Sequence, residues 1–304
     1  PAMIKRGYDA EFSAAVTAPS PPAGPTLPPS LPMVSAGTVT GLSVSRLFVA
    51  GIIPGLLLGF GLGIVSYLIS VKRNHPKEDR LPFREVVRSF FSAFWAILMT
   101  LIILGGIMGG FFTPTEAAMI AVFYALIVGF FVYGELKLAA LPKIIFDSAV
   151  TTASLMVLVG FANVFAWILT SEEIPLMVTQ AMLSISSGPT GYIILVNILL
   201  VFVGMFMETI AALMILMPIL LKPAIALGID PIQFAIMCVL NLVIGLTTPP
   251  VGVCLFVASS IAKISVGRLS VALIPFIAVS LLVLLLVSFV PQVTLFLPNL
   301  VFNK

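Results

Sequence analysis

Long apolar stretches separated by short polar loops fill most of the chain. Such stretches cover residues 45–71, about 93–112 and 115–133, 143–170 and 267–290. A helix needs roughly 20 consecutive apolar residues to cross the hydrocarbon core of a bilayer. The pattern therefore predicts an all-α multi-span membrane protein.

Three further apolar regions carry interruptions. We predict two short helices, one at residues 11–18 and one that ends near Thr40. Between Pro19 and Pro32 we expect no helix, because each proline removes a backbone hydrogen-bond donor. A second broken helix is predicted over 231–262, with its break at Gly245–Pro250. The stretch 190–222 has a polar centre, and we interpret it as a re-entrant hairpin in preference to one overlong span.

The two broken regions resemble each other. Asp9 to Pro54 can be aligned on Asp230 to Pro275 with small gaps. The shared positions are Gly24, Pro28 and Pro29 with Gly245, Pro249 and Pro250, and Ser43-Val44-x-Arg46-Leu47 with Ser265-Val266-x-Arg268-Leu269. Inverted repeats that carry paired broken helices are typical of secondary transporters.

Basic residues indicate the orientation. The densest basic cluster lies in Lys72–Arg88, which the preference of Lys and Arg for cytoplasmic loops places inside the cell. With 190–222 as a hairpin dipping in from outside, Lys263 and Arg268 also become cytoplasmic, and the C-terminus becomes periplasmic. The two copies then have opposite orientations, as expected for a multi-pass protein of a bacterial inner membrane.

This reading divides the chain into three parts. Residues 1–71 form the C-terminal part of the first repeat, whose N-terminal part we expect to be missing. Residues 72–142 hold the basic loop, an amphipathic helix at 81–92 and two scaffold spans. Residues 143–304 form the second repeat, with the hairpin 190–222, the broken helix 231–262 and the last span 267–290.

Composition agrees with a membrane location. Apolar residues make up 60% of the 304 positions and charged residues 9%, against roughly 45–50% and about 25% in soluble domains. The net charge of +3 comes from loop residues, so we expect no nucleic acid partner. His75 is predicted to be a solvated loop residue, Cys238 and Cys254 small core residues, and Glu116 the partner of Thr113 in a helix-capping box.

The breaks carry the candidate chemistry. A broken helix leaves carbonyls unpaired at the end of its first half and N–H groups unpaired at the start of its second half. The carbonyls suit a hard cation such as sodium, and the N–H end suits a carboxylate. Hydroxyls of Ser30, Thr247 and Thr248 lie at the same depth, and Asn241 lies one turn before the second break. Asn241 serves equally well as a simple helix–helix hydrogen bond. Glu208 is a functional candidate, since acids within a membrane usually are, and a surface carboxylate is the alternative reading.

Several motifs together resemble the large membrane subunit of tripartite ATP-independent periplasmic (TRAP) transporters. They are Gly24–Met33, Phe112–Ala118, Gly204–Thr209 and Asn241–Gly252. The resemblance implies sodium-coupled import of an organic acid, such as a C4-dicarboxylate or a sialic acid, by an elevator movement. It also implies two partners, a small membrane subunit and a periplasmic substrate-binding protein, with the lipid bilayer around them.

The resemblance further implies the site residues. One sodium site is expected at Gly24, Pro25, Pro28 and Ser30, and the other at Gly204, Thr209, Asn241, Gly245 and Thr248. The substrate is expected between the breaks, near Pro29, Glu208, Thr247, Pro249 and Pro250. The chain departs from the family pattern at Pro19, Pro21 and Pro22, where small residues are usual, and at Ala36, where tyrosine is common.

Other functions remain open at this point. The sequence contains no nucleophile–base pair, phosphate loop or nucleotide motif, so an enzyme is not expected and sodium ions are the only cofactor expected. A stand-alone dicarboxylate or citrate symporter has a similar architecture, and an ion channel also contains broken helices. A membrane scaffold without transport is the third alternative.

Overall fold

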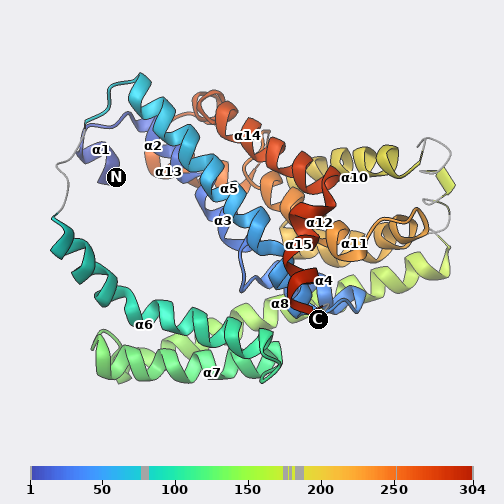
Figure 1. Ribbon diagram of the computed structural model, residues 1–304, viewed down its shortest axis with the longest axis horizontal. Helices are drawn as coiled ribbons and strands as arrows, with labels where there is room; N and C mark the ends of the chain where they lie inside the picture. The colour runs from blue at the N-terminus through green and yellow to red at the C-terminus, as the bar shows by residue number, and fades with distance from the viewer. Residues whose placement is uncertain are drawn as a thin grey trace. The chain divides into compact units, whose positions relative to one another are not determined.

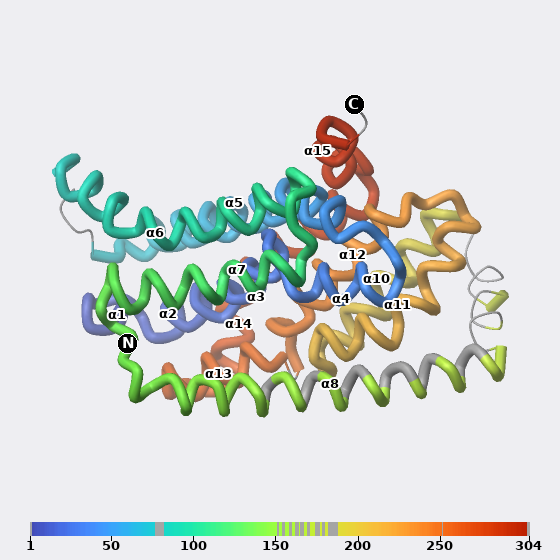
Figure 2. Tube along the Cα trace, turned by 90° about the horizontal axis from the view of Figure 1, so that it is seen from below, coloured from blue at the N-terminus to red at the C-terminus, as the bar shows by residue number. Residues whose placement is uncertain are grey.

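The computed structural model describes residues 2–76, 82–173, 177, 180–181, 188–250 and 252–302, apart from a number of side chains in the long helix at 141–171. The chain divides into two compact units: residues 1–76 with 161–304, and residues 77–160. Every regular element in the described residues is helical, which confirms the predicted all-α class. Figures 1 and 2 show the helices in two perpendicular views.

The unit at 77–160 is built on two antiparallel helices. These are α6 (Phe83–Met108) and α7 (Pro114–Ile127), which continues as a π-helix at Val128–Val132 and is followed by a short 3-10 turn and α8 (Leu141–Ser171). Tyr124 and Tyr133 of this second segment donate their hydroxyls to carbonyls of α6, each at 2.8 Å. The predicted capping box is confirmed, since Thr113 and Glu116 each accept the other's backbone N–H.

One prediction for this unit is wrong. The expected amphipathic helix at 81–92 and the expected span at 93–112 form a single helix, α6. The reason is local: no glycine or proline interrupts the sequence from Phe83 until Gly105, so nothing ends the first segment.

The larger unit contains both broken helices and the hairpin. Its helices in chain order are α1 (Ala2–Lys5), α2 (Ala10–Thr17), α3 (Ser20–Thr26), α4 (Leu31–Thr40), α5 (Val44–Lys72), α10 (Pro189–Gly204), α11 (Thr209–Ala226), α12 (Pro231–Gly245), α13 (Val253–Ala262), α14 (Val266–Phe289) and α15 (Pro291–Phe302).

The first repeat differs from its prediction in one respect. We expected no helix between Pro19 and Pro32, yet Ser20–Thr26 is helical as α3. Pro21 and Pro22 lie in the first turn of α3, where N–H groups have no partner within the helix, so these prolines remove no hydrogen bond. The true break is therefore confined to 27–30.

The last part of the chain also differs from expectation. The last predicted span ends at residue 290, and the structure has a further helix, α15, directly after it. Pro291 stands at its first position, where the fixed φ angle of proline favours a new helix. Thr294 within α15 is fully buried.

The long helices that follow the two broken helices, α5 and α14, begin in the same way. The Ser43 hydroxyl accepts the N–H of Arg46 at the start of α5, and the Ser265 hydroxyl accepts the N–H of Arg268 at the start of α14, both at 3.4 Å. A proline lies inside each helix at the matched position, Pro54 and Pro275. The sequence similarity between the repeats thus corresponds to equivalent local structure.

The two broken helices run in opposite directions. Glu11 at the start of α2 lies 3.8 Å from Arg268 at the start of α14. Gln233 at the start of α12 donates to the backbone oxygen of Ser288 near the end of α14, at 2.9 Å. Because α2 and α12 begin at opposite ends of the same long helix, the broken helices are inverted relative to each other.

The stretch at 190–222 forms a helical hairpin. The Tyr192 hydroxyl near the start of α10 donates to the backbone oxygen of Leu220 in the second half of α11, at 2.6 Å, so the two arms are antiparallel. The arm α10 packs on α12 and the arm α11 packs on α4, as Figure 2 shows. The hairpin therefore contacts both broken helices.

Within the described residues, five segments are long and apolar enough to cross a membrane: α5, α6, α7 with its π-helical extension, α11 and α14. The helix α11 is long enough to be a separate span. It is nevertheless one arm of the hairpin, because it pairs antiparallel with the shorter α10. The helix α12 is buried along its full length, so it forms the centre of the larger unit.

His75 does not match its prediction as a solvated residue. Its side chain is only 4% exposed and contacts the rings of Tyr8 and Phe12. Its two ring nitrogens lie 3.2 Å from Asp9 Oδ2 and from Ser70 Oγ. The loop after α5 folds back on the segment before α2, a long-range contact with no signal in the local sequence.

Candidate functional site: the two helix breaks and the hairpin tip

The second break and the hairpin tip are in direct backbone contact. A Cβ atom added to Gly245 would lie 2.6 Å from the backbone of Gly204, so only glycine permits this approach. The N–H of Gly252 at the end of the break donates to the backbone oxygen of Met205 at 3.1 Å. The predicted proximity of the hairpin tip to the second break is therefore present.

Gly252 is the last residue of the break and has a backbone conformation that favours glycine. Its φ is +39°, and an added Cβ would lie 3.0 Å from the backbone oxygens of Leu246 and Thr248. The carbonyls of the break are less open than expected, because Gly245 O accepts from Thr248 N and Leu246 O accepts from Cys254 N, both at 3.0 Å. Because these backbone carbonyls already accept hydrogen bonds, a cation at this break would also need oxygens from side chains.

Asn241 supplies an oxygen with no partner in the described protein. Its side chain is fully buried, and its Nδ2 donates to Oδ1 and O of Asn197 at 2.7 Å and 3.0 Å. Its Oδ1 accepts no hydrogen bond from the described residues. The nitrogen of this amide therefore makes the helix–helix bond that the sequence left open, and its oxygen has no partner among the described residues.

Thr209 supplies a second such oxygen. It is the first residue of α11, directly after the hairpin tip, and it is 2% exposed. Its hydroxyl also lacks a partner in the described part of the chain. A buried acceptor without a partner costs about 1–3 kcal/mol, a cost that a bound cation removes.

The remaining hydroxyls at the breaks are partly engaged. Thr247 and Thr248 both donate to the backbone oxygen of Ile244 at 2.9 Å. Ser30 donates to the backbone oxygen of Pro25 and accepts the N–H of Met33, so it caps the start of α4. A hydroxyl has two lone pairs, so Thr247 and Thr248, which only donate, keep both for a cation, and Ser30, which accepts one N–H, keeps one.

The other predicted residues differ in exposure. Pro25, Pro28 and Pro249 are half-buried, while Gly24, Pro29 and Pro250 are exposed. The bonds Pro28–Pro29 and Pro249–Pro250 are both cis. Glu208 is exposed and caps α11, since its Oε2 accepts the N–H groups of Ile210 and Ala211 at 2.8 Å and 3.0 Å.

The helices that carry the two breaks pack on one another. The helix α12 contacts both α3 and α4, which flank the first break. The wall of the first break is formed by α5, because added Cβ atoms on Gly51 and Gly55 would each lie 3.0 Å from the backbone oxygen of Thr26. Both breaks thus lie within the larger unit, against the same central helix.

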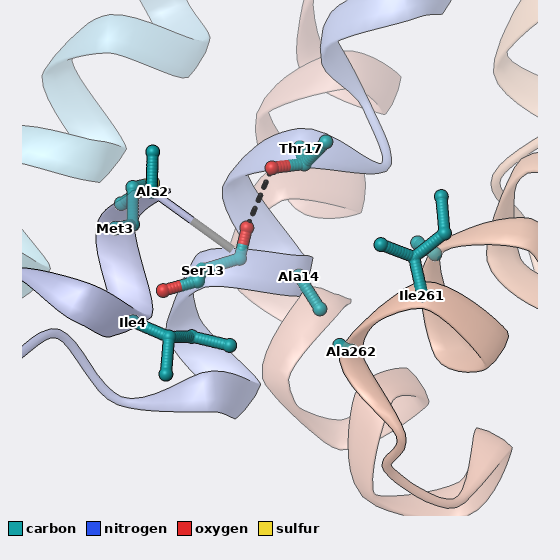
Figure 3. A pocket seen from close by; sticks show the side chains of 9 residues that line it. Ala2, Met3, Ile4, Ser13, Ala14, Thr17, Ile261 and Ala262 are labelled. Atoms are coloured by element: carbon teal, nitrogen blue, oxygen red, sulfur yellow. Dashed lines mark hydrogen bonds between the residues drawn. The ribbon is translucent and has the colours of Figure 1, made fainter.

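Two of the cavities that lie away from the breaks are lined by residues of α2. One, of about 240 Å³, is lined mainly by alanine, methionine and isoleucine side chains of α1, α2 and α13 (Figure 3). The buried Ser13 hydroxyl borders it and has no partner among the described residues. The other, of about 440 Å³, is lined by Lys72, Arg73 and Arg268 together with Glu11 and apolar residues of α2, α5 and α14.

Sequence reasoning missed a buried polar group beside Asn241. Asn197, Gln233 and Ser288 are each at most 9% exposed and come from α10, α12 and α14. A lone asparagine or glutamine in an otherwise apolar stretch was the available signal, since polar side chains within membrane helices usually face a partner.

Comparison with known proteins gives a consistent result. Residues 1–293 match the family described as "Tripartite ATP-independent periplasmic transporter, DctM component". The chain is 43% identical over 297 residues to the isethionate TRAP transporter permease protein DctMQ of Oleidesulfovibrio alaskensis, a match that covers 97% of this chain and 47% of that protein.

Two further relatives are similar at the same level. The C4-dicarboxylate TRAP transporter large permease protein DctM of Pseudomonas aeruginosa is 40% identical, with 98% of this chain and 70% of that protein covered. The sialic acid TRAP transporter large permease protein SiaM of Vibrio cholerae is 41% identical, with 96% and 69% covered. The chain thus spans about half to two thirds of the lengths of these relatives. From the whole-chain match and these identities, the chain belongs to the DctM component of the tripartite ATP-independent periplasmic transporters, a family of membrane transport proteins.

Proposed function

We propose that this chain forms the ion- and substrate-binding part of a sodium-coupled importer of an organic acid. The observation that carries the proposal is a pair of buried oxygens beside the second break and the hairpin tip, Asn241 Oδ1 and Thr209 Oγ1, that have no hydrogen-bond partner among the described residues. Amide, hydroxyl and carbonyl oxygens at a broken helix are the ligands with which secondary transporters hold sodium.

The sodium is assigned to the residues around these oxygens. Asn241, Thr209 and Thr248 contribute side-chain oxygens, and Gly204 and Gly245 allow the backbones of the hairpin and the break to meet. The second sodium is assigned to the first break, at Gly24, Pro25, Pro28 and Ser30. Here the support is the inverted equivalence of the two breaks.

The substrate is assigned to the space between the breaks. Helices α4 and α13 start there, and the N–H groups of a helix start attract a negative group. The relatives are named for isethionate, C4-dicarboxylates and sialic acid, each of which carries an acidic group. We assign the acidic group of the substrate to these helix starts, and the rest of the substrate to a lining formed by Pro29, Thr247, Pro249 and Pro250, with Glu208 at the hairpin tip.

The orientation and partners follow from the family and from charge. Lys72, Arg73 and Arg268 line one cavity, which supports a common cytoplasmic side for the end of α5 and the start of α14. The C-terminus is then periplasmic. We propose a small membrane subunit and a periplasmic binding protein as partners, as TRAP transporters are tripartite by name.

We also propose an elevator movement. Both breaks and the hairpin belong to the unit formed by residues 1–76 and 161–304, while α6 and α7 belong to the unit at 77–160. A unit that holds the whole binding region can carry ion and substrate together relative to a fixed scaffold.

Uptake by the complete transporter in proteoliposomes tests the proposal. With the binding protein and an organic acid outside, uptake is expected to require external sodium. Equal uptake when potassium or choline replaces sodium would contradict the proposal. Uptake without the binding protein would indicate a stand-alone symporter, and conductance far above transporter rates would indicate a channel.

A further inference from the structure

A chain of buried polar side chains lies behind the proposed sodium ligand Asn241. It consists of Asn197 on α10 and Ser288 on α14, with Gln233 nearby on α12. Asn197 is 9% exposed, Gln233 5% and Ser288 1%. Polar groups at such depth are costly unless each donor and acceptor is matched, so their directions are determined by their neighbours.

The amide of Asn197 has only one possible orientation. Its Nδ2 lies 2.9 Å from the backbone oxygen of Ile193, which can only accept a hydrogen bond. It also lies 3.1 Å from Ser288 Oγ, and that hydroxyl donates its own hydrogen to the backbone oxygen of Leu284 at 2.7 Å. The nitrogen of Asn197 must therefore face α14, and its oxygen must face Asn241.

This orientation determines that of Asn241. The Asn241 amide lies against two acceptors, Oδ1 and O of Asn197, at 2.7 Å and 3.0 Å. A reversed Asn241 amide would place its oxygen against both of these oxygens, so the nitrogen must face Asn197. The Asn241 oxygen consequently points the other way, where the described protein offers it no donor.

We propose that Asn197 is a positioning residue that orients the Asn241 amide so that its oxygen is presented to sodium. The inference rests on the proposed function and adds a residue to it. The donor sequence runs in one direction, from Asn241 to Asn197 to Ser288 and then to the Leu284 carbonyl. Asn197 itself does not touch the ion.

Gln233 provides a matched control. It is also a buried amide, and it lies on the same helix as Asn241. Its Nε2 donates to the backbone oxygens of Val287 and Ser288, at 3.2 Å and 2.9 Å. Within the described structure its side chain makes no hydrogen bond with Asn197 or Asn241, so its replacement removes a buried amide without altering the orientation of Asn241.

The test measures the sodium concentration that gives half-maximal uptake in proteoliposomes, with the substrate saturating. For Asn197→Leu this concentration is expected to rise about tenfold, which corresponds to the loss of one orienting hydrogen bond. The maximal rate at saturating sodium is expected to stay within about twofold, because the ligand oxygen itself remains. Gln233→Leu is expected to leave the half-maximal concentration unchanged.

Asn197→Ser is a second variant in case the leucine variant fails to fold. Membrane helices accept small polar residues, and serine is too short to reach Asn241, so the same rise is expected. An unchanged sodium requirement in the Asn197 variants, or equal rises in these variants and in Gln233→Leu, would overturn the inference while leaving sodium coupling intact. Sodium-independent uptake by the unaltered protein would overturn both.

Discussion

The two broken helices share a motif but differ in what surrounds it. In the second copy the first half is one fully buried helix, α12, and Asp230 caps its start by accepting two N–H groups. In the first copy the corresponding segment is divided into α2 and α3, and Asp9 makes no cap. Asp9 instead lies 3.1 Å from Arg73 and 3.2 Å from His75.

The walls of the two breaks differ in the same way. The second break is held by the hairpin through Gly204 and Met205, whereas the first lies against Gly51 and Gly55 of α5. Equivalent sequence positions therefore carry different structural demands. The difference shows that the motif determines where a helix breaks, and the packing partner determines which of its residues can be replaced.

The largest effect is expected where this difference is greatest. Gly245→Ala places a Cβ 2.6 Å from the backbone of Gly204, and rigid backbone cannot move aside easily. Overpacking of this kind costs about 1–3 kcal/mol or more, so we expect a lower melting temperature in detergent and loss of uptake.

The matched control is Gly24→Ala. Gly24 is the counterpart of Gly245, but an added Cβ there has no described atom within 4 Å, and Gly24 lies inside α3. Alanine is favoured over glycine in a helix by about 1 kcal/mol, so the melting temperature should stay the same or rise. Equal destabilisation by both substitutions would contradict the proposed contrast.

The second prediction separates stability from ion binding. Thr209→Val replaces a buried hydroxyl, which has no partner in the part of the chain that the structure describes, by a methyl group of similar shape. Removing an unsatisfied buried group is expected to stabilise the sodium-free protein by about 1 kcal/mol. If the hydroxyl is a ligand, the sodium concentration for half-maximal uptake should rise at the same time, by about tenfold.

Thr26→Val is the control in the first copy. Thr26 is equally buried, but its hydroxyl donates to the backbone oxygen of Ala23 at 2.7 Å. Its replacement is expected to lower stability slightly and to leave the sodium requirement unchanged. A Thr209→Val protein with an unaltered sodium requirement would remove Thr209 from the site.

A third, smaller effect concerns the helix starts. Asp230→Ala removes the cap of α12, which typically costs about 1 kcal/mol. Asp9→Ala removes no cap, and the Asp9 side chain is 55% exposed, so its contacts with Arg73 and with the buried His75 are expected to contribute less, about 0–1 kcal/mol. The melting temperature should therefore fall more in Asp230→Ala than in Asp9→Ala. A larger fall in Asp9→Ala would contradict the conclusion that only Asp230 caps a helix.

The smallest effect is a dependence on pH. The hydrogen bond with His75, and then that with Arg73, lowers the pKa of Asp9 below its ordinary value. A lowered folded-state pKa means that the stabilisation is complete above the ordinary value, about 4, and is lost as the pH falls through the lower one. Asp9→Asn should weaken the decline in stability below about pH 4, as measured by melting at a series of pH values.

The sequence predicted the features that depend on local chemistry. The capping box at Thr113 and the break at Pro249–Pro250 follow from side chains that act within a few residues of themselves. The order of the hairpin and the broken helices along the chain was also predicted, because the positions of proline and glycine and the lengths of the apolar stretches indicate it.

Other features depend on residues far apart in the chain. The burial of His75 comes from Asp9, Tyr8 and Phe12, more than 60 positions away, and no local pattern records that contact. The direction of the Asn241 amide depends on Asn197 and Ser288, which lie on two other helices. The helicity of α3 shows that the positions of prolines within a turn matter more than their number.

Binding of sodium by the second break is the central claim, and the melting temperature of the purified protein tests it most directly. Sodium chloride is exchanged for potassium chloride at constant ionic strength, so that only specific binding to the folded state changes stability. We expect sodium to raise the melting temperature of the unaltered protein and of Gln233→Leu equally, and to raise that of Asn241→Leu less, because only the proposed site at the first break remains in that variant. The same melting temperature in both salts for the unaltered protein, or a sodium effect in Asn241→Leu as large as in the unaltered protein, would contradict the account.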